Sequence, residues 1–274
     1  MTRWAAFAGI TLAVLVLLLV LARTSQSVVG GSAYVAREEL RWLDRLDDGA
    51  EHLDVAAAPS PGRTSPAEAT LQPGPEPTTL ALLANVTVSH GLFAALLGAG
   101  IWLTDVPSSA LGVTDAPLST GPAALAVGAA LGVAIALANT MAAGLADVFE
   151  TDPSEELRAL LAPETRRGWV VLLVVVLPVI AGFEELLFRA ALIGGFAAGF
   201  GVSPWILAVL SSVAFAAGHG AQGALGVVVT GLLGLALAVA FVLTNSLLVV
   251  VVAHYVVNAV EFAVVEGMGW KPFE

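Results

Sequence analysis

Two carboxylates and a guanidinium lie inside an otherwise apolar stretch, GFEELLFRAALIGG at residues 182–195. Glu185 and Arg189 are four residues apart, so an α-helix would place them on one face, in the Glu-before-Arg order that favours an ion pair. Glu184 would point about 100° away and has no obvious partner within its own helix. A charge at the centre of a bilayer costs roughly 2.5–3.5 kcal/mol unless it is paired or hydrated. We therefore expect Glu184 to face a water-filled cavity, where it could hold a water molecule or a proton.

Two further apolar segments carry polar side chains that could meet this carboxylate. FAAGH places Phe215 and His219 four residues apart, and HYVVN places His254 and Asn258 on one face of another segment. A glutamate and a histidine can together deprotonate a water molecule and return the proton to a leaving amine. A second histidine and an asparagine can donate hydrogen bonds to a developing oxyanion. These residue types fit the hydrolysis of a peptide bond.

A metal centre is the alternative chemistry for the same residues. Two histidines and one glutamate could bind zinc and leave a position open for water. No segment contains the HExxH motif of a zincin helix. The spacing of His254 to Asn258 suits oxyanion donation, so we expect no cofactor and keep a divalent metal such as zinc as the alternative. Its ligands would be Glu184, His219 and His254.

The segments EELLFR, FAAGH and HYVVN resemble, in order, three motifs of one protein family. The motifs are EExxxR, FxxxH and HxxxN, and the family is CPBP, the CAAX-processing and bacteriocin-processing intramembrane proteases. The same family is also called Abi or type II CAAX prenyl endopeptidases. Each motif is short, but all three in order, each in an apolar run, make the resemblance specific. It covers about residues 169–265.

The resemblance implies a role for each matching residue of this chain. Glu184 would be the catalytic glutamate and, with His219, would position the attacking water. Glu185 would pair with Arg189 to orient the site. The remaining roles are the oxyanion hole, for His254 and Asn258, and the wall of the pocket, for Phe215.

The residues and the resemblance together predict an intramembrane endopeptidase. Its substrate would be a membrane-associated protein or peptide, and the resemblance implies that a prenylated CAAX-type protein is one candidate. Two alternatives use the same fold or the same buried charges. One is a non-catalytic membrane scaffold or immunity protein, and the other is a proton-coupled transporter, whose expected inverted repeats are not evident.

The elements that must position these residues are predicted to be membrane helices. Of the 274 residues, 58% are hydrophobic and only 12% are charged, whereas soluble domains average about a quarter charged residues. Runs of about 20 apolar residues can cross the roughly 30 Å of hydrocarbon. We expect an all-α, multi-pass bundle of seven to eight spans in the cell membrane, with a polar intramembrane cavity. The runs are 4–22, 80–103, 122–146, 169–199, 204–219, 223–243 and 246–265.

The domain organisation follows from these runs. Residues 1–22 form an N-terminal transmembrane anchor, because their uncharged stretch is longer than a signal-peptide core. Residues 23–79 are an amphipathic and Pro-rich linker, 80–147 hold the second and third spans, and 169–265 form the CPBP-like catalytic domain. The net charge of −11 disfavours nucleic acid as a partner, and the absence of cysteine excludes a thiolate site.

Three further features concern side chains in the apolar runs. His90 has no polar partner at helical spacing and is predicted to be structural. Glu261 continues the stripe of His254, and could support the site or lie near the membrane interface. If the runs 169–199 and 204–219 were simple antiparallel spans, Glu184 and His219 would lie some 22 Å from opposite faces, so a tilt or a kink at Pro178–Gly182 would have to bring them together.

Overall fold

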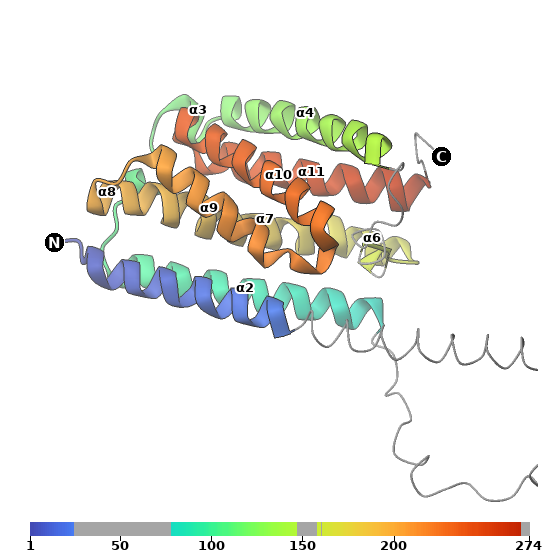
Figure 1. Ribbon diagram of the computed structural model, residues 1–274, viewed down its shortest axis with the longest axis horizontal. Coiled ribbons are helices and arrows are strands. Elements are labelled where there is room, and N and C mark those ends of the chain that lie inside the picture. The colour runs from blue at the N-terminus through green and yellow to red at the C-terminus, as the bar shows by residue number, and fades with distance from the viewer. Residues whose placement is uncertain (25–77, 147–157, 160, 270–274) are drawn as a thin grey trace, which may run out of the picture. The chain divides into compact units, whose positions relative to one another are not determined.

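The structure is a computed structural model that describes residues 1–24, 78–146, 158–159 and 161–269. The linker predicted at 23–79 therefore lies almost wholly outside the described residues. Within the described ranges every regular element is a helix and no strand occurs, which confirms the all-α prediction. Figure 1 shows the helices lying side by side as a bundle.

The helices follow the chain in the order of the predicted apolar runs. The first described helix is Trp4–Thr24. The other α-helices are α2 (Thr79–Leu103), α3 (Pro117–Thr120), α4 (Pro122–Ala146), α6 (Arg166–Val171), α7 (Leu177–Glu185), α8 (Phe196–Phe200), α9 (Pro204–Gly218), α10 (Gly223–Thr244) and α11 (Leu247–Glu261). The short 3-10 helices are η4 (Ser108–Leu111) and η7 (Gly220–Gln222). Three segments are π-helical: η5 (Leu172–Val176), η6 (Leu186–Gly195) and η8 (Phe262–Gly267).

Six of the described helices are long and apolar enough to cross a membrane. Helix α9 has only 15 residues, a length of about 22 Å, and so falls short of a full crossing. Of the seven runs predicted as spans, all form helices and six have the length of a span. These six are Trp4–Thr24, Thr79–Leu103, Pro122–Met141, Arg166–Phe200, Gly220–Thr244 and Leu247–Val264.

The segment that carries the carboxylates is one continuous helix in which α- and π-helical stretches alternate. It spans Arg166–Phe200 as a single helix. Pro178 lacks a backbone N–H and cannot bond to a carbonyl four residues earlier. The π-helical turn η5 ends just before this proline, where the wider hydrogen-bonding pattern takes up the irregularity. The second π-helical stretch, η6, begins directly after Glu185, and such stretches often occur at functional sites.

A tight turn joins this long helix to α9 and sets the depth of the site. Gly201 ends α8 with φ of 67°, a left-handed conformation that glycine adopts without strain, and Pro204 starts α9. Glu184 and His219 each lie about 15 residues, or some 22 Å, from this one turn. The expectation that they lie that far from opposite faces is wrong, because an antiparallel hairpin brings both to the same level without a kink.

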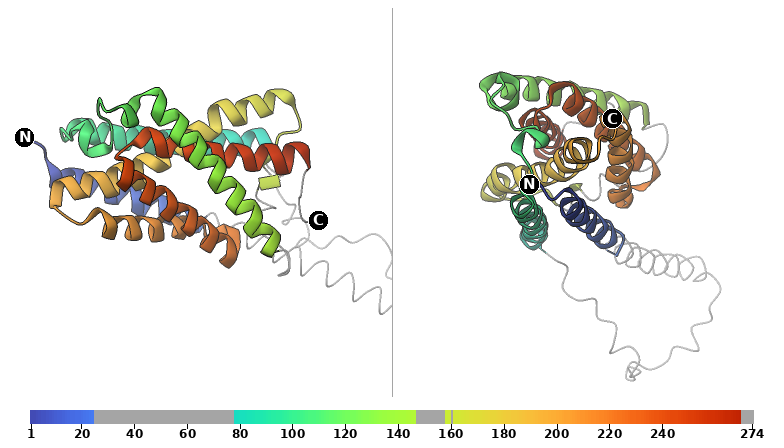
Figure 2. Two further views of the ribbon diagram at one scale, coloured as in Figure 1. Left: turned by 90° about the horizontal axis from the view of Figure 1, so that it is seen from above. Right: turned by 90° about the vertical axis from the view of Figure 1, so that its left-hand side faces the viewer.

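Helix α4 packs against α11, the helix that carries His254, through two glycines. A Cβ atom at Gly128 would lie 2.7 Å from the carbonyl oxygen of Val249, and one at Gly132 would lie 2.6 Å from that of Ala253. The small residues thus allow the two backbones to approach closely, as in other membrane helix pairs. Figure 2 shows α4 crossing α11 obliquely.

The N-terminal helix is also part of the bundle. The backbone N–H of Arg3 donates to the carbonyl oxygen of Thr104 at 2.9 Å. Phe7 is fully buried and belongs to a core that contains Phe93 and Phe183. This core lies directly behind the polar residues of the site.

Candidate functional site

The predicted ion pair between Glu185 and Arg189 is present and fully buried. Arg189 Nη1 donates to Glu185 Oε1 at 2.7 Å, and both side chains have 0% exposure. Arg189 Nη2 donates to the carbonyl oxygen of Gly234 at 2.9 Å. The guanidinium therefore connects the end of α7 to α10, and its charge is neutralised where no water reaches it.

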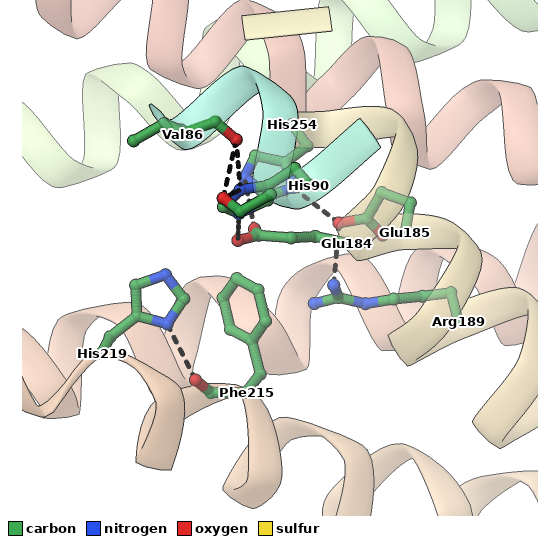
Figure 3. Close-up of polar contacts among 9 residues, drawn as sticks. Val86, His90, Glu184, Glu185, Arg189, Phe215, His219 and His254 are labelled. Carbon is green, nitrogen blue, oxygen red and sulfur yellow. Dashed lines mark hydrogen bonds and ion pairs between the residues drawn. The ribbon is translucent and has the colours of Figure 1, made fainter. Parts of the chain in front are cut away.

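His254 from α11 joins the same carboxylate. Its Nδ1 lies 2.7 Å from Glu185 Oε1, so one oxygen of Glu185 holds both Arg189 and His254 (Figure 3). The Nε2 atom on the other side of the ring lies 3.6 Å from Glu184 Oε2. With two positions of the ring occupied, the orientation of this imidazole is fixed.

Glu184 is buried, with 7% exposure, and lies between two imidazoles. His254 approaches Oε2, and His90 Nε2 lies 3.7 Å from Oε1. His90 comes from α2, far from the three motifs in the sequence. Within α2 the ring contacts Ser89 Oγ at 3.5 Å through Nδ1, whereas its charged partner, Glu184, is supplied by packing of α2 against α7 (Figure 3). An ionisable residue within a predicted membrane span often marks a functional site. By that criterion the sequence itself indicates His90.

The backbone contacts of two histidines determine which ring nitrogen carries the proton. His90 Nδ1 lies 2.9 Å from the carbonyl oxygen of Val86, and His219 Nδ1 lies 2.8 Å from that of Phe215. A carbonyl oxygen only accepts hydrogen bonds, so each Nδ1 must be the donor. In a neutral ring the opposite nitrogen, Nε2, is then an acceptor.

His219 follows directly after the last residue of α9 and is half-buried. Its ring packs on Phe215 with 4.6 Å between centroids. No hydrogen bond or ion pair among the contacts of the described residues joins His219 to Glu184, although the two groups interact electrostatically. Figure 3 shows His219 apart from the carboxylate, with the ring of Phe215 beside it.

Phe215 lies at the centre of the polar residues. Its ring is 4.8 Å from the guanidinium carbon of Arg189 and 6.0 Å from the ring of His254. A cation over an aromatic face is an attractive contact. Phe215 therefore packs against three polar side chains of the site, Arg189, His219 and His254.

Asn258 lies one helical turn beyond His254 on α11 and is half-buried. Within the part of the chain that the structure describes, no hydrogen bond involves its side chain. The amide is thus not committed to a helix–helix contact. Glu261, further along the stripe, accepts a hydrogen bond from Asn139 Nδ2 at 3.0 Å and so joins α11 to α4.

Residues 166–260 match the family model described as type II CAAX prenyl endopeptidase Rce1-like. This segment, the Rce1-like domain, is similar to that family. The match confirms the resemblance of the three motifs to CAAX proteases. Comparisons with curated proteins and with solved structures give no match.

The Rce1-like domain holds all the motif residues but not the whole site. The match begins with α6 and ends within α11. It therefore contains Glu184, His219 and His254, whereas His90 lies outside it. With six apolar helices of span length among the described residues, the chain is an integral membrane protein.

The predicted zinc ligands do not converge in the Rce1-like domain. Among the described residues, no three histidine or acidic side chains form a group that could hold a metal ion. Zinc needs its ligand atoms about 2.0–2.2 Å from a common centre, and His219 has no direct contact with Glu184. The set Glu184, His219 and His254 does not fit a zinc centre in this arrangement.

A cavity of about 270 Å³ lies elsewhere in the bundle, between η4 and the Rce1-like domain. Its lining includes Gly194, Pro204 and Asn245, which surround the turn between α8 and α9. None of the motif residues lines it. It is not the water-filled cavity that the sequence predicts around Glu184.

Proposed function

We propose that this chain is an endopeptidase of the cell membrane that hydrolyses a peptide bond of a membrane-associated protein or peptide. A prenylated CAAX-type protein is the first substrate class to test, because the Rce1-like match describes prenyl endopeptidases. One observation carries the proposal. A buried glutamate, Glu184, is flanked by imidazole nitrogens, and one of these rings is held by a carboxylate–guanidinium pair.

Glu184 is the proposed general base. A water molecule beside its carboxylate attacks the carbonyl carbon of the scissile peptide, and the carboxylate takes the proton as the new C–O bond forms. The tetrahedral intermediate then collapses, the C–N bond breaks, and Glu184 returns the proton to the leaving amine. The products are a carboxylate and an amine, and no co-reactant is needed.

His254 and Asn258 are the proposed donors to the oxyanion. Since His254 Nδ1 already faces Glu185, only a protonated ring can also donate from Nε2. Protonation would balance the charges of the buried cluster: the two glutamates carry two negative charges, and Arg189 and His254 carry two positive ones. A balanced cluster is less costly to bury than an unpaired charge.

His219 is the proposed partner of Glu184 in positioning the water. Its Nδ1 is held by the carbonyl of Phe215, which leaves Nε2 as the acceptor. Catalytic contacts in a substrate-free enzyme are often longer than those in the substrate complex. The position of His219 at the end of α9, with glycines on both sides, suits a small approach toward the water.

The test is a comparison of peptide termini in membrane proteins from cells with and without this chain, with a Glu184→Gln variant in the same cells. Peptide ends that need the wild-type chain and vanish with Glu184→Gln support an endopeptidase and reveal its substrate. Glu164→Gln, a change at an exposed glutamate, is the matched control and should retain all of them. If Glu184→Gln produces the same ends as wild type, the endopeptidase proposal fails and a non-catalytic scaffold is favoured.

A further inference from the structure

His90 is the imidazole nearest to one oxygen of Glu184. Its Nε2 atom lies 3.7 Å from Glu184 Oε1, while His254 occupies the side of Oε2 at 3.6 Å. The ring of His90 packs edge-on against Phe183, with centroids 5.5 Å apart. Two independent contacts therefore hold the ring beside the carboxylate: Phe183 on its face and the carbonyl of Val86 at Nδ1.

The tautomer of His90 decides what can lie between the two groups. Because Nδ1 donates to Val86, a neutral ring presents a lone pair at Nε2 toward Glu184. Two acceptors cannot hydrogen-bond to each other, and 3.7 Å is longer than a direct bond. A water molecule has two O–H groups and can donate one to each acceptor. This leaves a lone pair of the water oxygen pointing away from both.

We propose that His90 is a catalytic residue that holds the nucleophilic water together with Glu184. This proposal rests on the endopeptidase function proposed above. One O–H of the water donates to Glu184 Oε1, and that proton passes to the carboxylate when the oxygen attacks the carbonyl carbon. The second O–H donates to His90 Nε2, which orients the oxygen and takes no proton. The proton on Glu184 goes to the amine nitrogen as the C–N bond breaks.

The consequence is a hydrolytic site that extends beyond the Rce1-like domain. The domain supplies the carboxylate, the oxyanion donors and the ion pair, and α2 supplies the second acceptor for the water. Each oxygen of Glu184 then has its own imidazole, His90 at Oε1 and His254 at Oε2. Because a water molecule has only two O–H groups, His90 would then accept the one that His219 would otherwise accept, and His219 has no direct contact with Glu184.

The proposal is tested with purified protein and an internally quenched S-farnesyl peptide with a CAAX-type C-terminus. His90→Phe keeps an aromatic ring against Phe183 but removes the acceptor nitrogen. We expect kcat to fall about 100-fold, as for a reacting group that is no longer held in position, with KM little changed. Thr87→Val, on the same helix, is the matched control: it removes a hydroxyl whose one hydrogen bond among the described residues goes to the carbonyl of Leu83. If the farnesyl peptide is not cleaved, the Glu184-dependent termini in cells are the readout.

His90→Ala provides a second measurement that a purely structural role would not move. Free imidazole can enter the space left by the side chain and restore the acceptor, and we expect it to raise the rate at least about fivefold. If His90→Phe does not fold, this stimulation decides, and its absence overturns the proposal.

The results also separate this inference from the proposed function. A folded His90→Phe with a rate within threefold of wild type, alongside an inactive Glu184→Gln, overturns the role of His90 and leaves the endopeptidase intact. A Glu184→Gln variant as active as wild type overturns both.

Discussion

Glu185 Oε1 and His254 Nδ1 lie 2.7 Å apart although 69 positions separate the two residues in the chain. The same oxygen accepts a hydrogen bond from Arg189, whose other nitrogen donates to Gly234. A single carboxylate therefore connects α7 and η6 to both α10 and α11. The arrangement of three helices depends on this one buried charge.

Replacing Glu185 with glutamine should both destabilise the protein and abolish hydrolysis. The change leaves the fully buried guanidinium of Arg189 without its counter-charge, which typically costs about 3–5 kcal/mol. His254 also loses the acceptor that orients its ring. The free energy of unfolding in detergent and the rate on the quenched peptide measure the two effects. Glu164→Gln is the exposed control, and a Glu185→Gln variant as stable as wild type would contradict the assignment.

Replacing Gly132 with alanine should disturb the site from a distance. The new Cβ would lie 2.6 Å from the carbonyl oxygen of Ala253, next to His254, so α4 and α11 must separate. We expect a loss of about 1–3 kcal/mol, as for other overpacked positions, together with reduced hydrolysis. Gly98→Ala is the matched control because a Cβ there meets no atom within 4 Å, and thermal unfolding of the two variants distinguishes packing from helix propensity.

Asn258→Ala should slow hydrolysis without lowering stability. No hydrogen bond among the described residues uses its side-chain amide, so its removal breaks no hydrogen bond there. Loss of one oxyanion donor typically reduces kcat by about 10²–10³. Steady-state kinetics test the expected fall in kcat, and thermal unfolding of the same preparation tests the unchanged stability. A large fall in stability would instead indicate that the amide joins helices.

Removal of metal ions should leave the rate unchanged. The predicted ligand set does not converge on a common centre among the described residues, and Glu184 with one neutral imidazole, that of His90, can hold the water without a metal. Elemental analysis of the purified protein and the rate after dialysis against a chelator test this. Stoichiometric zinc, with a rate that is lost on chelation and restored by zinc, would contradict it.

The sequence predicted the membrane class and the core of the site because both are encoded locally. Apolar runs of span length translate directly into helices, and Glu185–Arg189 is an i to i+4 pair that needs only a helical backbone. The match of residues 166–260 confirms the family to which the three motifs point. The roles of the individual site residues stay predictions until the variants are measured.

Other features depend on tertiary structure and could not be predicted in the same way. His90 acquires its partner only when α2 packs against α7, and no spacing within α2 indicates that contact. The π-helical stretches η5 and η6 arise around Pro178 and the buried charges, and apolar periodicity does not distinguish them from α-helix. The common level of Glu184 and His219 follows from the turn that joins their helices, which the position of each residue within its own apolar run does not reveal.

The shared turn at Gly201 fixes how far along their helices Glu184 and His219 lie from a common point. The two helical arms are of similar length, so adding one residue within α9 would advance His219 by about 1.5 Å and rotate it by about 100° about the helix axis, away from Glu184. Adding the same residue at the exposed tip, between Val202 and Ser203, would leave both helical arms intact. The number of helical residues between the turn and each motif is thus constrained as strictly as the motif residues themselves. The tip of the turn, in contrast, can vary in length.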